Sequence, residues 1–290
     1  MRTHGIKETI LSTLWTEEGP KEMPNAKDAA NSTYHNILLV GPTGSGKTTQ
    51  IRTLPGKKFA YLFDPNALAS LRGADVDYEE WLPDALELDT TIKGFNKGSK
   101  SARPPSAKEP RIYVDWVADL TKKAEEEFFA SYDWVCFDSL TFLQKSVFDR
   151  QMYLNNRFGG VEELADYRVV GSKLSDLFRS ITSEQTNIFC TGHLQTFQDE
   201  KTKVITTQLN LSGQARGTIP LMFSDIWLAK NSSTEDTLKY QIQTRPAARG
   251  LDTIRSSVSG LEMYEDVTIE NISNPETYGI GKILNSIRNT

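Results

Sequence analysis

One segment of the chain combines the residue types that bind phosphate groups. It fits the phosphate-loop pattern G-x-x-x-x-G-K-[ST] at every fixed position and reads Gly41-Pro42-Thr43-Gly44-Ser45-Gly46-Lys47-Thr48. A triphosphate needs many hydrogen-bond donors in a small space, and glycines let successive backbone N–H groups point inward. We expect Lys47 to reach the β- and γ-phosphates of ATP and the Thr48 hydroxyl to ligate Mg²⁺. Thr49 completes the candidate cofactor-binding residues.

The flanking residues indicate a strand before this segment and a helix after it. Ile37-Leu38-Leu39-Val40 is typical of a buried parallel strand. Thr48 to Arg52 contains no Pro or Gly, so it predicts a helix whose positive N-terminal end adds to the phosphate site. A glycine turn that happens to precede a lysine is the alternative, and the order strand, loop, helix favours the phosphate loop.

A carboxylate at the end of a second buried strand is the expected partner of a phosphate loop. Trp134-Val135-Cys136-Phe137 leads directly into Asp138. An acidic residue in this position holds the hydration shell of Mg²⁺, so we predict Asp138 and Thr48 as the metal site. The alternative is an Asp that caps the next helix without a metal contact, which the neighbouring Ser139 makes credible.

Three more candidate residues follow later strands. His193 ends the strand predicted from Asn187, and because strand ends line the ligand crevice of a parallel sheet, we expect a polar sensor of the γ-phosphate. A histidine with only a structural hydrogen bond is the alternative. Arg245 and Arg249 follow the last clear strand and could stabilise charge on a transferred phosphoryl group in a neighbouring subunit, or be ordinary surface arginines.

The composition is that of a globular protein with an acidic balance. The chain has 290 residues, 38% hydrophobic and 24% charged, and its net charge is -5. Proteins that coat DNA are usually basic, so any nucleic-acid contact must come from a local patch or an assembled ring or filament. No apolar run approaches the roughly 18 residues that span a bilayer. With no apolar signal-peptide core after Met1, we expect no membrane and a cytoplasmic location.

The cysteines and histidines exclude two further kinds of site. Cys136 and Cys190 lie in apolar runs and are expected to be buried thiols in a reducing compartment, without a disulfide. The three histidines and two cysteines show no paired spacing, which argues against structural zinc.

Strand and helix patterns alternate along the chain and predict an α/β fold. The expected architecture is a three-layer P-loop fold with a mainly parallel central sheet. Later segments with alternating patterning and short turns predict a C-terminal antiparallel extension. The segments are Lys201–Asn210, Asp225–Ala229 and Thr237–Thr244.

We divide the chain into three parts. Residues 1–33 are predicted as an N-terminal helix and tether, which either docks on a neighbouring subunit or packs on its own domain. Residues 34–255 form the ATPase core, and 256–290 are a C-terminal extension that ends in a helix near Ile280–Ile287. Within the core, 93–111 is rich in Lys, Arg, Gly, Ser and Pro and is predicted as a flexible basic loop, either a nucleic-acid contact or a solvated excursion.

The layout resembles a RecA-like core ATPase, specifically the compact phage nucleotide-binding proteins related to phage single-strand annealing ATPases. The resemblance is carried by Ile37–Thr49, Phe59–Asn66, Trp134–Leu140 and Ile188–His193, with a looser match over Leu211–Gly250. It implies ATP binding and hydrolysis in a homo-oligomer that acts on single-stranded DNA or on a single-strand-binding protein. The roles of Lys47, Thr48, Asp138 and His193 given above are also those of this family.

One departure from the RecA pattern concerns the residue that activates water. That pattern has Asp-Thr-Glu after the second strand, whereas this chain has Asp64-Pro65-Asn66. An amide cannot accept a proton as a carboxylate does. Hydrolysis is therefore slow, or Asp64, Glu79 or Glu80 replaces the missing Glu.

The sequence thus favours a RecA-like ATPase that acts on single-stranded DNA in phage recombination or replication. Asn66 favours a different class, a nucleotide-binding assembly or regulatory protein with little turnover. A small-molecule kinase is the third possibility, and its lid over the acceptor could only be the 93–111 loop.

Overall fold

The computed structural model describes residues 34–84, 109–198, 200, 203, 205–247 and 251–288. The chain divides into two units, Met1–Thr33 and Tyr34–Thr290, and the fold below is that of the second. The predicted N-terminal helix and tether and most of the 93–111 loop lie outside the described residues.

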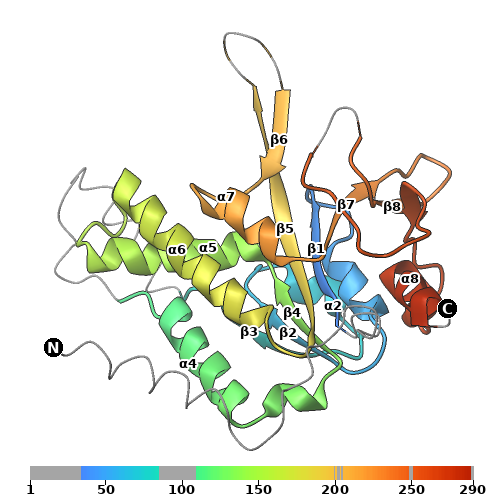
Figure 1. The fold of residues 1–290 in the computed structure, drawn as a ribbon, viewed down its shortest axis with the longest axis horizontal. Helices are drawn as coiled ribbons and strands as arrows, with labels where there is room; N and C mark the ends of the chain where they lie inside the picture. Colours follow the sequence, from blue (N-terminus) through green and yellow to red (C-terminus); the bar gives the residue numbers. More distant parts are fainter. Residues whose placement is uncertain are drawn as a thin grey trace, which may run out of the picture. The chain divides into compact units, whose positions relative to one another are not determined.

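A nine-stranded sheet organises the second unit (Figure 1). Its order is β3-β2-β4-β5-β1-β7-β8-β9, and β6 pairs with β5 outside this path. The strands are β1 Asn36–Gly41, β2 Lys58–Leu62, β3 Asp77–Glu80, β4 Trp134–Asp138, β5 Asn187–Gln198, β6 Ile205–Leu209, β7 Asp225–Asn231, β8 Tyr240–Gln243 and β9 Tyr264–Asp266.

Strand direction confirms the predicted fold class. The strands from β3 to β7 along the order run parallel, and β1 lies between β5 and β7. The β7–β8, β8–β9 and β5–β6 pairs are antiparallel and form the expected extension. The second unit is an α/β fold with a mainly parallel sheet and an antiparallel extension.

Helices cover both faces of the sheet, because the strands are apolar on both faces. In β1, Leu38 and Val40 face one hydrophobic cluster, while Ile37 and Leu39 face the other. The first cluster lies under α4 Ile112–Glu125, α5 Leu140–Leu154 and α6 Leu164–Ile181. The second lies under the short 3₁₀ helix η1 Thr48–Thr53, α2 Ala67–Leu71 and α8 Gly279–Arg288. Smaller helical turns are η2 Phe128–Ser131, α7 Ala215–Thr218, η3 Ile219–Met222 and η4 Pro275–Thr277.

Three sequence predictions of local structure were incomplete or wrong. The segment after the phosphate loop is a 3₁₀ helix of six residues that ends at Thr53, because Leu54 precedes a proline and is driven to extended backbone. Asp225–Ala229 was expected to be antiparallel, yet β7 runs parallel to β1 and is antiparallel only to β8. Strand β3 was not foreseen, since its short polar sequence at the sheet edge carries no apolar pattern.

Two further predictions, of the C-terminal helix and of the cysteines, were confirmed. The C-terminal helix expected at Ile280–Ile287 is α8. Cys136 and Cys190 are both buried and free. Among the described residues, no helix is long and apolar enough to cross a membrane.

The C-terminal segment packs directly on η1, beside the phosphate loop. The Gln50 side-chain amide donates to the Val267 carbonyl at 2.9 Å and accepts from the Ile280 N–H at 3.0 Å. The Gly281 N–H donates to the Thr53 hydroxyl at 3.3 Å. Gln50 and Thr53 are buried, so these bonds are shielded from water. The extension is therefore part of the layer that supports the phosphate loop.

This contact predicts that Gly281 tolerates no side chain. A Cβ at this position would lie 1.9 Å from the Thr53 carbonyl oxygen and 2.8 Å from that of Glu276. We expect Gly281→Ala to lower the free energy of unfolding by about 3 kcal/mol, measured by urea denaturation. Gly217→Ala is the matched control, because its Cβ meets nothing within 4 Å. Equal unfolding midpoints for the two variants would contradict the close packing of α8 on η1.

Candidate nucleotide-binding site

The backbone conformation and the close packing of the phosphate loop require glycine at three positions. Gly44 and Gly46 have φ angles of +78° and +82°, in the region that other residues rarely adopt. At Gly41 the limit is space, because a Cβ would lie 2.6 Å from Ser45 Oγ and 2.7 Å from the Ala229 carbonyl oxygen. The loop between β1 and η1 thus has the conformation that the motif predicts.

Lys47 lies inside this loop. Its ammonium donates to the Pro42 carbonyl at 2.9 Å, and the Ser45 hydroxyl donates to the same oxygen at 2.8 Å. Burial lowers the pKa of the Lys47 ammonium, while the nearby carboxylates of Asp138 and Asp64 oppose this effect. A cation with few waters around it gains more from an anionic ligand than one in bulk solvent. Lys47 is therefore placed and poised for a phosphate group.

Asp138 ends β4 directly behind the loop. It is fully buried and accepts hydrogen bonds from Thr48 Oγ1 at 2.9 Å and from Thr191 Oγ1. Burial raises the pKa of the Asp138 carboxyl, and the two hydroxyl donors work against that rise. Its side chain bonds to these hydroxyls, whereas the capping alternative requires bonds to the first turn of α5. The structure thus brings together the two residues predicted to hold Mg²⁺.

The oxygen ligands available here fit an Mg²⁺ ion that is bound jointly by the protein and by the phosphates of a nucleotide. The ion prefers oxygen ligands and usually binds through one or two carboxylates plus substrate phosphates. In the part of the chain that the structure describes, no group of three or more His, Cys, Asp or Glu side chains could hold a metal alone. Thr48 would supply the hydroxyl ligand and Asp138 the carboxylate. When bound, Mg²⁺ neutralises charge that develops on the phosphate oxygens.

His193 and Asp64 meet at the edge of the same site. His193 Nε2 lies 3.2 Å from Asp64 Oδ2, and this hydrogen bond is the main reason that the pKa of Asp64 is below its ordinary value. His193 is paired with Gly41, the last pair between β5 and β1. Strand β5 does not end there, as the sequence suggested, but continues to Gln198 in the hairpin with β6. His193 lies where β5 leaves the parallel sheet, which is where a ligand crevice is expected.

A cavity of about 520 Å³ joins these elements. Predicted site residues line one part of it, namely Thr43, Gly44, Gly46, Lys47, Thr48, Thr49, Asp64 and His193. Gly41, Pro42, Ser45 and Asp138 do not line the cavity but form the turn and the buried carboxylate behind it. The size is in the range of known ligand pockets.

Other predicted residues lie away from the cavity. Glu79 is in β3 and accepts a hydrogen bond from Lys123 at 2.7 Å, and Glu80 is its exposed neighbour. The Arg245 guanidinium donates to the Leu261 carbonyl and does not line the cavity of its own chain. Arg249 lies outside the described residues. Of the carboxylates considered as substitutes for the missing Glu, Asp64 is the one that lines the cavity, and Asn66 lines it too.

Two sets of residues were missed by the sequence analysis. Thr191 donates a hydrogen bond to Asp138, but it lies within an apolar strand. The only sequence signal for this role is that a hydroxyl residue directly precedes Gly192-His193. The second set is apolar, comes from the chain around β8 and after β9, and lines another part of the cavity. Its members are Leu238, Tyr240, Val267, Ile269 and Ile272.

Comparison with known proteins identifies the family. A family described as AAA domain matches residues 33–251, a range that contains the phosphate loop and every parallel strand. The chain belongs to the AAA domain family. With the phosphate loop and the Thr48–Asp138 pair in place, this AAA domain is a P-loop ATPase in class and binds nucleotide. No curated protein matches the sequence.

Solved structures show only a distant likeness. The flagellar accessory protein FlaH of Methanocaldococcus jannaschii is 13% identical, with a TM-score of 0.39, over 82% of this chain and 87% of that chain. A KaiC-like protein of Pyrococcus horikoshii is 12% identical, with a TM-score of 0.41, over 83% of this chain and 87% of that chain. At this level of similarity, neither protein informs the function of this AAA domain.

The position of Lys47 predicts a strong effect of its removal. We expect Lys47→Ala to weaken ATP affinity about 10- to 100-fold, because a charge-assisted hydrogen bond to phosphate is lost. Calorimetric titration measures the change. Lys57→Ala is the control, because this lysine is surface-exposed and pairs with Asp77 outside the cavity. Unchanged affinity in Lys47→Ala would refute the site.

The Thr191–Asp138 hydrogen bond predicts an effect on magnesium rather than on nucleotide. Thr191→Val keeps the shape of the side chain but leaves one oxygen of a buried carboxylate without its donor. We expect the Mg²⁺ concentration for half-maximal ATP hydrolysis to rise about three- to tenfold. Thr196→Val is the control, because Thr196 lies on the same strand and bonds only to Thr207. Identical Mg²⁺ curves would show that Thr191 does not position Asp138.

Proposed function

We propose that this AAA domain hydrolyses ATP at the described site and couples turnover to single-stranded DNA, in phage recombination or replication. The observation that carries the proposal is the convergence of Lys47, Thr48, Asp64 and His193 on one cavity, with Asp138 directly behind Thr48. Phosphoryl transfer to water uses a loop that holds the phosphates, ligands for Mg²⁺ and a residue that orients the water, and these residue types are present here. The proposed location is the cytoplasm, that of the host for a phage protein.

Each side chain has a separate role in this proposal. Lys47 neutralises charge on the terminal phosphates, and Thr48 and Asp138 hold the metal. We assign to Asp64 the orientation of the attacking water, because it is a carboxylate that lines the cavity and is bonded to His193. His193 also borders Gly41 at the end of the loop strand, so it is placed to respond to the terminal phosphate. Asp64 thus takes the place of the Glu that Asn66 replaces.

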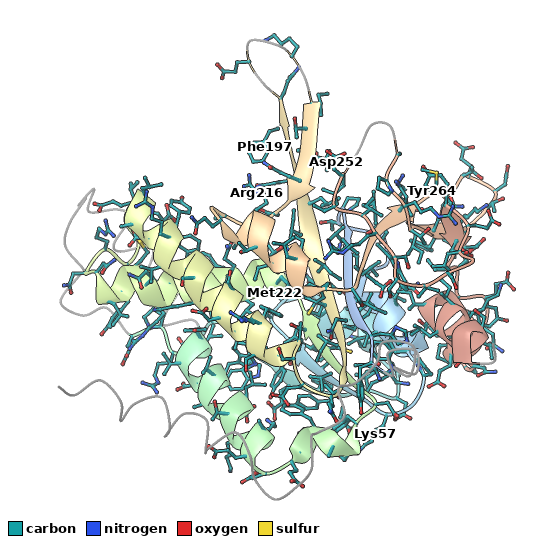
Figure 2. The ribbon with its side chains drawn as sticks, in the orientation of Figure 1. Lys57, Phe197, Arg216, Met222, Asp252 and Tyr264 are labelled. Atoms are coloured by element: carbon teal, nitrogen blue, oxygen red, sulfur yellow. The ribbon has the colours of Figure 1, made fainter. Side chains whose placement is uncertain are left out.

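The hairpin of β5 and β6 supports a nucleic-acid partner. It extends beyond the parallel sheet and begins one residue after His193 (Figure 1). Phe197 on this hairpin is 45% exposed, and the Arg216 guanidinium lies 5.8 Å from its ring centre. Figure 2 labels both side chains. Exposed aromatic rings with a neighbouring arginine stack on unpaired bases whatever their sequence. A single strand, or a protein bound to one, is the proposed partner.

An assembled state is part of the same proposal. Arg245 is held near Leu261, outside the cavity of its own chain. An arginine that acts on phosphate from this position would have to act on the site of a neighbouring subunit. We therefore propose a homo-oligomer, in which Arg245 or Arg249 completes the site of the next subunit.

A second candidate function is a nucleotide-dependent assembly or regulatory protein with little turnover. The observation that favours it is the lowered pKa of Asp64, since a weakly basic carboxylate is a poor proton acceptor. Asn66 points to the same conclusion. The kinase alternative depended on the 93–111 loop, and most of that loop lies outside the described residues.

Phosphate release with and without single-stranded DNA distinguishes the two functions. For the ATPase we expect measurable turnover that an oligonucleotide raises severalfold and that Asp64→Asn lowers about 100-fold, because the water loses its carboxylate. ATP binding to Asp64→Asn should remain. Absence of turnover under both conditions, with intact ATP binding, would support the regulatory protein instead.

The hairpin predicts which residue carries the DNA response. Phe197→Ala should reduce oligonucleotide affinity about tenfold, the equivalent of one lost stacked base, while basal hydrolysis stays the same. Fluorescence anisotropy of a labelled oligonucleotide measures it. Tyr78→Ala is the matched control, since Tyr78 is also aromatic and 45% exposed but lies on the edge strand β3. Equal affinity of both variants would remove the hairpin from the proposed interface.

A further inference from the structure

The cavity that contains the phosphate loop has a second, apolar part. Most of this part comes from Tyr240 in β8, from Leu238 just before β8 and from side chains that follow β9. Those that follow β9 are Val267, Ile269 and Ile272. Phe142 of α5 also lines the cavity. The Tyr240 ring lies against the loop, 3.3 Å from the position that a Cβ on Gly46 would take. The apolar part therefore begins directly beside the phosphate cradle.

Two aliphatic side chains in this part are strongly exposed. Leu238 is 62% exposed and Ile272 is 66% exposed, although both line the cavity. Each could gain from a flat apolar group that enters beside the phosphate loop, because such contact removes apolar surface from water. A nucleotide with its phosphates at Lys47 has one such group, which is its base.

The Gln50 side-chain amide and the Tyr240 backbone, which lie near this apolar part, already have hydrogen-bond partners. The Gln50 amide is bonded to Val267 and Ile280. The Tyr240 N–H donates to the Thr268 hydroxyl, and the Tyr240 carbonyl accepts from the Val267 N–H. Polar side chains that line the cavity away from the phosphate loop are Asn66 and Ser70, which belong to the α2 wall and not to the extension. A site that binds through apolar contact discriminates poorly between chemically similar ligands. A site built to hydrogen-bond one ligand can disfavour its analogue by several powers of ten.

We propose that Leu238, Tyr240 and Ile272 hold the base of the nucleotide by apolar contact, so that the site makes little distinction between adenine and guanine. This inference rests on the proposed nucleotide site and adds its base specificity. The phosphate loop binds the triphosphate, and the three apolar side chains contact the base without recognising its hydrogen-bonding groups.

The test is calorimetric titration of the full chain, in the presence of Mg²⁺, with ATP, GTP and inorganic tripolyphosphate. For the unaltered protein we expect the GTP affinity to lie within about tenfold of the ATP affinity. The double variant Leu238→Ser/Ile272→Ser should lose about tenfold in affinity for both nucleotides, while tripolyphosphate binds as before. Leu221→Ser is the control, because Leu221 is 72% exposed and lies outside the cavity, and it should bind all three ligands normally.

The outcomes separate this inference from the nucleotide site itself. If the double variant binds ATP like the unaltered protein, the base lies elsewhere, against the α2 wall or Phe142, and the inference fails alone. An ATP preference above 100-fold would overturn the base tolerance in the same way. If the unaltered protein binds neither the nucleotides nor tripolyphosphate, the nucleotide site fails together with the inference.

Discussion

The buried Asp138 carboxylate is the constraint on which the site depends. A carboxylate taken out of water is costly unless donors replace its hydration. Here the Thr48 and Thr191 hydroxyls do so, and they come from the loop segment and from a neighbouring strand. One side chain therefore ties β4 to η1 and to β5. The metal ligands, the loop and the strand that carries His193 keep their relative positions because these bonds share one acceptor.

The sequence could predict those parts of the site that depend on local backbone. Gly44 and Gly46 adopt positive φ angles that few other residues accept. Glycine at these two positions therefore nearly determines the backbone conformation of the loop. Asp138 was predictable because an acidic residue rarely follows a fully apolar strand by accident. Thr191 was not, since a hydroxyl inside such a strand looks like any β-branched residue. The apolar wall near Ile272 was missed because it depends on contacts such as Gln50 with Ile280, which no local pattern encodes.

The same limit explains the errors in the fold. Alternation identifies a strand but not its direction, and β7 turned out to run parallel to β1. The C-terminal extension looked like an appendage because its segments are short, yet its helix α8 belongs to the apolar cluster that also contains Ile51 and Leu54. Packing on η1 places the extension beside the nucleotide cavity.

The length of β5 has a mechanical consequence. One uninterrupted strand carries His193 in the parallel sheet and Phe197 in the projecting hairpin, with no turn between them. Such a ribbon transmits a displacement along its axis instead of absorbing it at a hinge. A proposed partner that displaces the hairpin would therefore also shift the contact between His193 and Asp64. Linkage makes such coupling reciprocal, so nucleotide binding would change the affinity for the partner by the same factor.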